Sequence, residues 1–335
     1  MPAFEALATH GHVRWGIIGC GDVTEVKSGP AFNRVPDSSI SVVMRRDGAK
    51  AQDYASRHGV PRWTTAAAEV IDADDVDAVY IATPPASHAE YTLRTAAAGK
   101  PVYVEKPMAR TRAEAEAMVG ACTAAGVPLF VAYYRRLLPR FEFVRRCLGD
   151  GTIGEPTMAR MELHWRAPAS ADTVGWRWDP EVGGDGLLLD LGSHGLDLLD
   201  HWFGPIEAVR GFSTTRLPWS RVTDEVVGAF RFESGVLGAA TWGFAGALPR
   251  DEIIITGSNG KLAVPLFEEG PVRVTDAAGR VTEHVIAHPQ HVQQPLITSI
   301  VAELLGRVGP AGPCPSTGHS ALRTQAVLER LLTRV

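Results

Sequence analysis

The stretch from Val13 to Thr24 constrains the fold more than any other part of this 335-residue chain. A short apolar run, residues 15–18, is rich in strand-forming residues and ends in a turn that contains Gly19 and Gly21. A helix-compatible segment follows directly. A strand, a tight glycine turn and the start of a helix are the context in which a Gly-x-Gly motif binds a dinucleotide. Gly19 permits a turn that a Cβ would obstruct, and Gly21 lets the backbone approach a pyrophosphate.

The third position of this fingerprint departs from the usual pattern. Thr24 stands where Gly or Ala is common. Taken alone, the motif fits an ordinary glycine turn between a strand and a helix equally well. We assign the first cofactor contacts to the turn itself, at Gly19, Gly21, Asp22 and Val23.

The first part of the chain reads as an α/β domain. Short apolar runs alternate there with Ala-rich helical stretches, which predicts a parallel, doubly wound sheet. The predicted strands are residues 15–18, 40–44, 78–82, 102–104 and 129–132. The predicted helices are residues 49–58, 66–71, 88–98 and 112–125. Gly59 and Gly126 stand where two of these helices should stop.

The pattern changes after about residue 136. Strands with alternating or aromatic patterns follow one another through glycine-containing turns, which predicts an α+β domain with a large, mainly antiparallel open sheet. These strands are residues 157–165, 208–213, 226–232, 236–245, 252–257, 260–264, 272–275 and 281–285. The predicted helices are residues 187–203, 295–307 and 319–333. We therefore predict a Rossmann domain at 1–135 and a substrate and oligomerisation domain at 136–335, with the last helix able to pack back on the first domain.

Composition excludes several classes of function. The net charge of −5 gives no field that would favour nucleic acid or an anionic membrane surface. The four cysteines are far apart in sequence, which argues against disulfides and a structural zinc site. The first twelve residues lack a signal-peptide core, so we expect a loose N-terminal tail and a cytoplasmic protein. His288 and His291 have no third ligand nearby in sequence, and we predict no metal site.

The end of the second strand bears on the choice of cofactor. A carboxylate at this point selects NAD by holding the ribose hydroxyls, whereas guanidinium groups suit the 2′-phosphate of NADP. The sequence has Arg45 and Arg46 there, followed by Asp47. We therefore predict that NADP(H) is preferred and NAD(H) possible. Asp47 as the ribose ligand, or a solvated arginine pair, are the alternatives.

Two further strands end in polar loops at the edge where a parallel sheet presents its cleft. The first loop carries Thr83, Pro84, Pro85 and His88, and the two prolines stiffen it. A His88 that only begins a helix is the plain alternative.

The second loop is Glu105-Lys106-Pro107. A residue before proline is pushed out of the helical region, so Lys106 leaves its strand facing the cofactor cleft. Its ammonium can bond the nicotinamide ribose and a substrate oxygen. A surface lysine paired with Glu105 is the alternative.

A glycine loop then leads into a helix that carries Asp190, His194 and Asp197, with spacings of four and seven residues that place them on one face. A carboxylate one turn from an imidazole can orient it and support its charged form, as a proton carrier near neutral pH requires. A packed or capping histidine is the alternative.

These motifs, in this order, resemble the glucose–fructose oxidoreductase/inositol dehydrogenase (Gfo/Idh/MocA) family. The matching stretches are residues 16–21, 82–88, 105–107, 134–136 with Pro139, and 183–197. Asp185 replaces the usual third glycine of the Gly-Gly-Gly loop. A short-chain dehydrogenase is excluded because the chain has no Tyr-x-x-x-Lys stretch.

The resemblance implies an NAD(P)-dependent dehydrogenase or reductase that acts on sugars, inositols or related polyols. By it, Lys106 matches the lysine of the Glu-Lys-Pro motif, and Asp190 and His194 match the Asp-x-x-x-His motif, so these three are the expected catalytic residues. Substrate contacts are assigned to Tyr134, Trp176, Arg177, Asp190 and His194. Further cofactor contacts are assigned to Thr83, Pro84, Pro85, His88, Glu105 and Lys106. An NAD-dependent glycosidase of the same family, or a catalytically silent nucleotide-binding protein, are the alternatives.

The sequence pattern of the second domain also predicts that the protein self-associates. An antiparallel sheet covered by helices on one face leaves its other face in need of a cover. We expect aromatic residues such as Trp242 and Phe244 on that open face, and a homodimer or homotetramer formed through it. The expected partners are thus a polyol or sugar and further copies of this chain, with no nucleic acid and no membrane.

Overall fold

The computed structural model describes residues 11–170, 173–310 and 312–332. The predicted N-terminal tail therefore lies outside the described residues up to residue 10. Contacts group the chain into two compact units. The first comprises the described residues up to Tyr134 together with Pro289–Leu322, and the second comprises Arg135–His288 together with the residues from Arg323 onward. The domain boundary at residue 135 stays a prediction.

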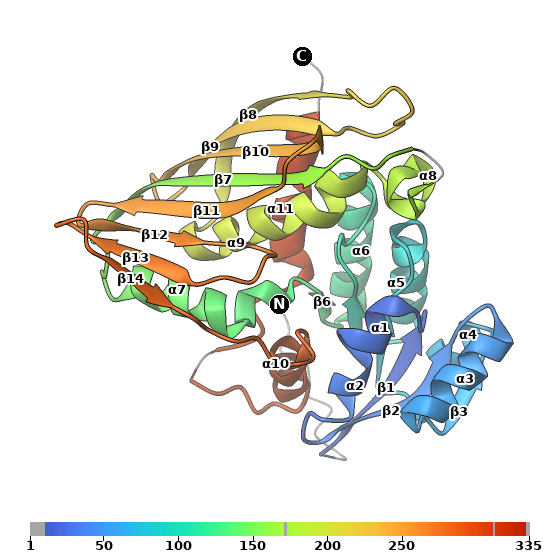
Figure 1. Cartoon of the computed structure of the whole chain (residues 1–335). Helices are drawn as coiled ribbons and strands as arrows, with labels where there is room; N and C mark the ends of the chain where they lie inside the picture. The colour runs from blue at the N-terminus through green and yellow to red at the C-terminus, as the bar shows by residue number, and fades with distance from the viewer. Residues whose placement is uncertain (1–10, 171–172, 311, 333–335) are drawn as a thin grey trace. The chain divides into compact units, whose positions relative to one another are not determined.

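The first unit is built on a six-stranded parallel sheet in the order β3-β2-β1-β4-β5-β6 (Figure 1). Its strands are β1 Val13–Ile18, β2 Ser38–Met44, β3 Arg62–Thr64, β4 Ala78–Ile81, β5 Val102–Val104 and β6 Leu129–Val131. Its helices include α1 Asp22–Val26, α2 Gly29–Phe32, α3 Gly48–His58, α4 Ala68–Ile71, α5 His88–Ala97, α6 Arg112–Ala125 and α10 Gln294–Leu304. The predicted Rossmann architecture is confirmed. Among the elements of this unit, the strand β3, three residues long with two of them exposed, and the four-residue helix α2 were not predicted.

The strand order reverses between β1 and β4, which places the loops after these two strands at the switch point where α/β sheets bind ligands. The two strand ends are joined directly, because the Ala82 N–H donates to the Ile18 carbonyl at 2.8 Å. Gly59 and Gly126 end α3 and α6 in the left-handed conformation, with φ of 65° and 69°, as predicted.

The second unit is built on an eight-stranded sheet in the order β14-β13-β12-β11-β7-β10-β9-β8. The β7–β10 pair is parallel and every other neighbouring pair is antiparallel, which confirms the predicted mainly antiparallel sheet. Its strands are β7 Pro156–Arg166, β8 Ile206–Thr214, β9 Glu225–Phe232, β10 Leu237–Gly246, β11 Arg250–Gly257, β12 Gly260–Val264, β13 Val272–Asp276 and β14 Val281–His284.

Helices cover one face of this sheet (Figure 1). They are α7 Pro139–Gly149, α9 Ser193–Phe203 and the part of α11 (Gly318–Leu332) that belongs to this unit. Helix α7 was not predicted, since it begins with a proline, four of its eleven residues are charged, and only Phe141, Val144 and Cys147, besides Arg140, are buried. The predicted helix at 187–203 begins instead with a π-helical turn, η5 Leu188–Gly192, which continues into α9.

Two glycines let α9 lie directly on the sheet. A Cβ at Gly195 would meet the Met161 sulfur at 2.1 Å, and a Cβ at Gly192 would meet the Trp242 indole nitrogen at 2.9 Å. Because Met161 is on β7 and Trp242 on β10, side chains at either position would force the helix away from the strands. These glycines therefore set the position of the helix that carries His194.

The prediction that Trp242 and Phe244 lie on the open face is wrong. Both side chains are almost completely buried, with exposed fractions of 0% and 1%, on the helix-covered face. The period-2 alternation of β10 shows which residues share a face, but not which face the helices cover. The opposite face carries four exposed apolar side chains in two cross-strand pairs, Met158 with Leu237 and Phe212 with Val227.

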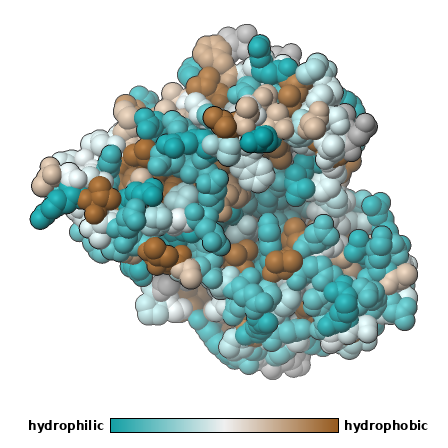
Figure 2. All heavy atoms as spheres, in the orientation of Figure 1, coloured by the Kyte–Doolittle hydropathy of each residue, from teal (hydrophilic) through white to brown (hydrophobic). Residues whose placement is uncertain are grey.

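In the view of Figure 2, hydrophobic residues lie in small, separate groups among hydrophilic ones. Among the described residues, no helix has the length and apolar character needed to cross a membrane.

Candidate active site

The glycine turn after β1 forms a narrow loop at the switch point. Gly19 adopts φ of 98°, and a Cβ there would lie 2.8 Å from the Thr83 methyl group. The Met44 carbonyl at the end of β2 accepts the N–H groups of Gly19 and Cys20 at 2.9 and 3.2 Å. A Cβ on Gly21 would meet nothing within 4 Å, so open space lies beside this residue. A tightly held loop with open space at its second glycine fits a bound pyrophosphate.

Thr24 is accommodated because its hydroxyl is turned inward. Its Oγ1 donates to the Gly21 carbonyl at 2.7 Å, and the side chain is fully buried. The Tyr54 hydroxyl in turn donates to the Thr24 carbonyl at 3.1 Å. The departure from the fingerprint thus adds a hydrogen bond within the turn and leaves the space beside Gly21 open.

The three residues after β2, Arg45, Arg46 and Asp47, have different surroundings. The Arg45 guanidinium donates to the Cys20 carbonyl at 3.0 Å, so this side chain lies against the glycine turn. Arg46 is exposed next to it. Asp47 is the N-cap of α3 and accepts the Lys50 N–H at 3.2 Å, which gives the carboxylate a structural partner.

His88 joins two of the predicted cofactor loops. Its Nε2 lies 2.7 Å from the Thr83 carbonyl, and its Nδ1 lies 3.1 Å from the Pro107 carbonyl. Burial lowers the pKa of His88, against the opposing effect of these carbonyls. The side chain therefore holds the loop after β4 to the loop after β5. A direct contact of His88 with cofactor stays a prediction.

Glu105 is held in a buried polar network that the sequence did not predict. Its Oε1 accepts the Tyr80 hydroxyl at 2.7 Å and the Gln293 amide at 2.6 Å, and its Oε2 accepts the Lys106 N–H at 3.1 Å. The Gln293 oxygen accepts the Tyr103 hydroxyl at 2.6 Å. The Lys106 N–H is therefore bound to a buried carboxylate that two other donors, Tyr80 and Gln293, hold in place.

In the second unit, Asp190 lies on the π-helical turn η5 and His194 on the first turn of α9. Both are buried, with exposed fractions of 5% and 1%. The Arg177 guanidinium donates to Asp190 and lies over the Trp176 ring, 4.5 Å from its centre. Trp176 and Arg177 belong to the short 3₁₀ turn η4 Trp176–Trp178. Three of the predicted substrate residues thus lie together, although the π turn replaces the regular helical spacing expected between Asp190 and His194.

An aromatic side chain lies beside His194. The Phe267 ring is 5.7 Å from the imidazole in an edge-to-face arrangement, and the Arg135 guanidinium lies 4.2 Å above the same ring. Tyr134, a predicted substrate residue, begins the 3₁₀ turn η2 Tyr134–Leu137 and is buried. Phe267 belongs to a loop without a recognisable motif, so no sequence signal pointed to it.

Asp197, the third polar residue of the predicted helical face, belongs to a buried ion cluster. Arg136 donates to its carboxylate from Nε at 2.8 Å and from Nη2 at 2.7 Å. The second carboxylate of the cluster, Asp200, accepts Arg323 at 2.9 and 2.6 Å. Burial raises the pKa of Asp197 to about 6, although Arg136 opposes the rise. Asp197 therefore anchors α9 to the segment that carries Arg136.

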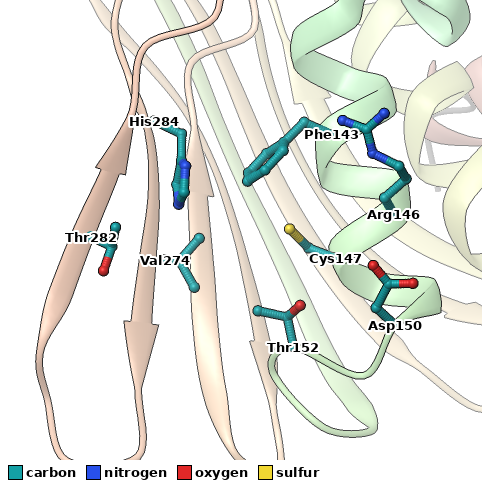
Figure 3. Close-up of a pocket in the computed structure, with 8 residues that line it drawn as sticks. All are labelled: Phe143, Arg146, Cys147, Asp150, Thr152, Val274, Thr282 and His284. Carbon is teal, nitrogen blue, oxygen red and sulfur yellow. The ribbon is translucent and has the colours of Figure 1, made fainter.

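A pocket of about 320 Å³ lies between α7 and the β13–β14 hairpin in the second unit (Figure 3). It is lined by Phe143, Arg146, Cys147, Asp150, Thr152, Val274, Thr282 and His284. None of these lining residues is among those that the sequence assigns to cofactor or substrate. Within the described residues, this hollow is therefore separate from the candidate site.

Comparison with known proteins shows which family this chain resembles. Residues 13–133 match the oxidoreductase family with an NAD-binding Rossmann fold, and residues 141–263 match the GFO/IDH/MocA C-terminal domain. The chain is 38% identical over 305 residues to oxidoreductase P35 of Formosa agariphila, across 90% of this chain and 93% of that protein. It is 34% identical over 227 residues to 1,5-anhydro-D-fructose reductase of Ensifer adhaerens, across 67% of each.

Among solved structures, a levoglucosan dehydrogenase in complex with NADH and levoglucosan has the same fold, with a TM-score of 0.84 and 22% identity over 96% of each chain. The match to the P35 oxidoreductase over nine-tenths of the chain, together with both domain matches, shows the family. The chain belongs to the Gfo/Idh/MocA oxidoreductases with an NAD-binding Rossmann fold, and it is a dehydrogenase or reductase.

Proposed function

We propose that this protein transfers a hydride between NADP(H) and a hydroxyl or keto carbon of a sugar, an inositol or a related polyol. The observation that carries the proposal is the ion pair of Asp190 with Arg177, whose guanidinium lies over Trp176, next to the helix turn that carries the buried His194. This arrangement combines an imidazole suited to proton transfer with polar and aromatic surface suited to a polyol. The names of two relatives, a 1,5-anhydro-D-fructose reductase and a levoglucosan dehydrogenase, support a sugar-like substrate.

The first unit holds the cofactor in this proposal. The turn at Gly19, Gly21, Asp22 and Val23 takes the pyrophosphate, and the loops from Thr83 to His88 and at Glu105 and Lys106 take the nicotinamide end. When bound, the nicotinamide accepts or supplies the hydride. Glu105, fixed by Tyr80 and Gln293, keeps the Lys106 backbone in place.

The second unit handles the proton. Oxidation of a hydroxyl releases a proton from the substrate oxygen, and reduction of a ketone requires one there. His194 carries this proton, because an imidazole has an ordinary pKa of about 6.5 against about 10.4 for an ammonium. The Asp190 carboxylate stabilises the imidazolium. The Lys106 ammonium donates to the same oxygen and stabilises charge that develops on it.

An activity screen tests this proposal directly. Sugars, inositols and their keto forms are incubated with NADP(H) and with NAD(H), and absorbance at the nicotinamide band is followed. We expect reversible cofactor turnover with at least one cyclic polyol. Net hydrolysis of a glycoside without cofactor turnover would instead support the NAD-dependent glycosidase. Tight cofactor binding without any reaction would support the silent nucleotide-binding protein.

The preference for NADPH gives a quantitative prediction. A bidentate, charge-assisted contact between a guanidinium and the 2′-phosphate contributes about 1.5–3 kcal/mol, so the Kd for NADPH should be about 10- to 150-fold lower than that for NADH. Fluorescence titration of the wild-type protein measures both. The Arg45→Ala/Arg46→Ala variant should lose most of this difference. An exposed arginine on α5, Arg94, provides the control substitution to alanine.

Equal or tighter binding of NADH by the wild-type protein would remove the claim. The role of Arg45 would then be confined to its hydrogen bond with the Cys20 carbonyl.

The proposal includes a homo-oligomer, but its interface involves other residues than Trp242 and Phe244. The exposed pairs Met158 with Leu237 and Phe212 with Val227 give the open sheet face its apolar surface. We expect a dimer or tetramer in sedimentation velocity at micromolar concentration, and dissociation in the Phe212→Asp/Leu237→Asp variant. Val281→Asp, an exposed position on the edge strand β14, is the control. A wild-type protein that sediments as a monomer would refute this part.

A further inference from the structure

The loop after β12, residues 265–271, is held in one conformation by a carboxylate. Asp251 on β11 accepts the backbone N–H groups of three consecutive residues, Leu266, Phe267 and Glu268, at 2.9, 2.6 and 2.7 Å. Hydrogen bonds to an ionised acceptor are stronger than those between neutral groups. The three amides therefore turn together towards one carboxylate, which fixes the backbone on either side of Phe267.

The carbonyl groups of the same loop are held by two arginines. Arg135 donates from Nε to the Leu266 carbonyl at 3.0 Å, and Arg140 donates from Nη1 to the Glu268 carbonyl at 2.8 Å. Both arginines are buried, with exposed fractions of 7% and 4%. Asp251 thus binds the N–H groups of the loop, and Arg135 and Arg140 bind its carbonyl groups.

This arrangement places the Phe267 ring between buried and exposed groups. The ring lies 5.7 Å from His194 at an angle of 79°, and 5.8 Å from Trp165 at 78°. The Arg135 guanidinium lies 4.2 Å from the ring centre. His194 is buried, whereas Phe267 is partly exposed and Trp165 is 38% exposed. A fixed aromatic surface therefore begins at the imidazole and continues to solvent.

We infer that Phe267 forms an aromatic wall beside His194 against which the apolar face of a cyclic substrate packs, and that Asp251 positions this wall. The inference rests on the proposed function and names a determinant of substrate choice within it. One face of a sugar or inositol ring presents several C–H groups together, and an aromatic ring held rigid binds such a face with little loss of conformational entropy. Phe267 orients the ring while His194 exchanges the proton.

The first experiment replaces the wall. Phe267→Leu keeps an apolar side chain and removes the ring, so KM for the best cyclic substrate of the activity screen should rise about tenfold. The Kd for NADPH should stay unchanged. Phe267→Tyr keeps the ring and should hold KM within about twofold of the wild-type value. An unchanged KM in Phe267→Leu, or an equal loss in Phe267→Tyr, overturns the inference.

The second experiment tests the positioning role of Asp251. Asp251→Ala removes the acceptor of three amides and should raise KM as Phe267→Leu does, while adding little in the double variant because both act through one ring. Asp251→Asn, which keeps one acceptor oxygen, should fall between Asp251→Ala and wild type and provides the measurement if the alanine variant does not fold. Additive effects in the double variant overturn the positioning role.

A matched control lies at the other end of β13. Asp276 also accepts backbone N–H groups, those of Ala278 and Arg280, in the turn that leads to β14. Asp276→Ala should leave KM unchanged, and an increase equal to that of Asp251→Ala would overturn the specific role of the Phe267 loop. Absence of any reaction in the screen contradicts the proposed function and this inference with it. Reaction with a KM that is insensitive to Phe267 contradicts the inference alone.

Discussion

Replacing His194 by alanine should lower kcat by at least about 10²-fold, the usual scale for general acid–base catalysis, while the Kd for NADPH barely changes. The imidazole is buried at the first turn of α9, in the second unit, whereas the residues assigned to cofactor all belong to the first unit. Steady-state kinetics with a substrate from the screen, together with a cofactor titration, measure both quantities.

Lys106→Ala is the companion variant. It should lower kcat and also weaken cofactor binding, because we assign its ammonium both to the substrate oxygen and to the nicotinamide ribose. The roles of the two residues could be inverted. If His194→Ala keeps the wild-type kcat and only raises KM, then His194 anchors the substrate and Lys106 carries the proton.

The second large effect concerns stability. Arg136→Met should lower the free energy of unfolding by about 3–5 kcal/mol at pH 7, the usual cost of leaving a buried charge without its partner. The carboxylate left behind, Asp197, has an exposed fraction of 1% and receives two hydrogen bonds from Arg136. Urea unfolding of the wild-type and variant proteins measures the loss. Arg323→Met, which removes a 43% exposed partner of Asp200, should cost clearly less.

The same cluster predicts a dependence of stability on pH. With a pKa of about 6 in the folded protein, Asp197 binds more protons when folded than when unfolded between about pH 4 and 6. Its contribution therefore makes the protein less stable as the pH rises through that window. Arg136→Met removes the charge that holds this pKa down, so the loss should continue above pH 6. This account would be contradicted if the free energy of unfolding of Arg136→Met decreased above pH 6 no more than that of the wild-type protein.

A further variant distinguishes two causes of the lost stability, the missing Arg136 contacts and the unpaired Asp197 charge. Arg136→Met/Asp197→Leu removes both members of the pair and should recover much of the stability lost in Arg136→Met, because replacing a buried ion pair by apolar side chains is often close to neutral. Recovery would also remove the added pH dependence.

Local patterns were sufficient to predict the parallel sheet of the first unit. The run at residues 15–18 followed by Gly19 and Gly21 identifies a strand and its turn within a few positions, and the alternation of strands and helices predicts a parallel sheet, although not the order of its strands. The motif residues Lys106, Asp190 and His194 lie in or beside such regular elements. Their assignment to catalysis stays a prediction until the kinetic experiments are done.

Other features depend on residues far apart in sequence. Gln293 reaches Glu105 across 188 positions, and no local pattern marks a lone glutamine before a helix as the partner of a buried carboxylate. Trp242 was placed on the wrong face because alternation along β10 is the same whichever face the helices cover. The π-helical turn at Asp190 has a leucine-rich sequence that reads equally well as regular α-helix.

The dependence of Glu105 on Gln293 has a consequence for how the polypeptide is made. The first segment of the first unit ends at Tyr134, and 158 residues, 135–292, lie between it and Gln293. All of them must be synthesised before Gln293 can donate to the Glu105 carboxylate. At about 5–20 residues per second, a ribosome needs roughly 8–30 s for that stretch. During this interval the nascent N-terminal segment carries the Glu105 carboxylate without its Gln293 donor and without the cover that α10 gives α2. Completion of the buried network beneath the NAD-binding Rossmann sheet therefore awaits the synthesis of Gln293, long after the six strands of that sheet have been made.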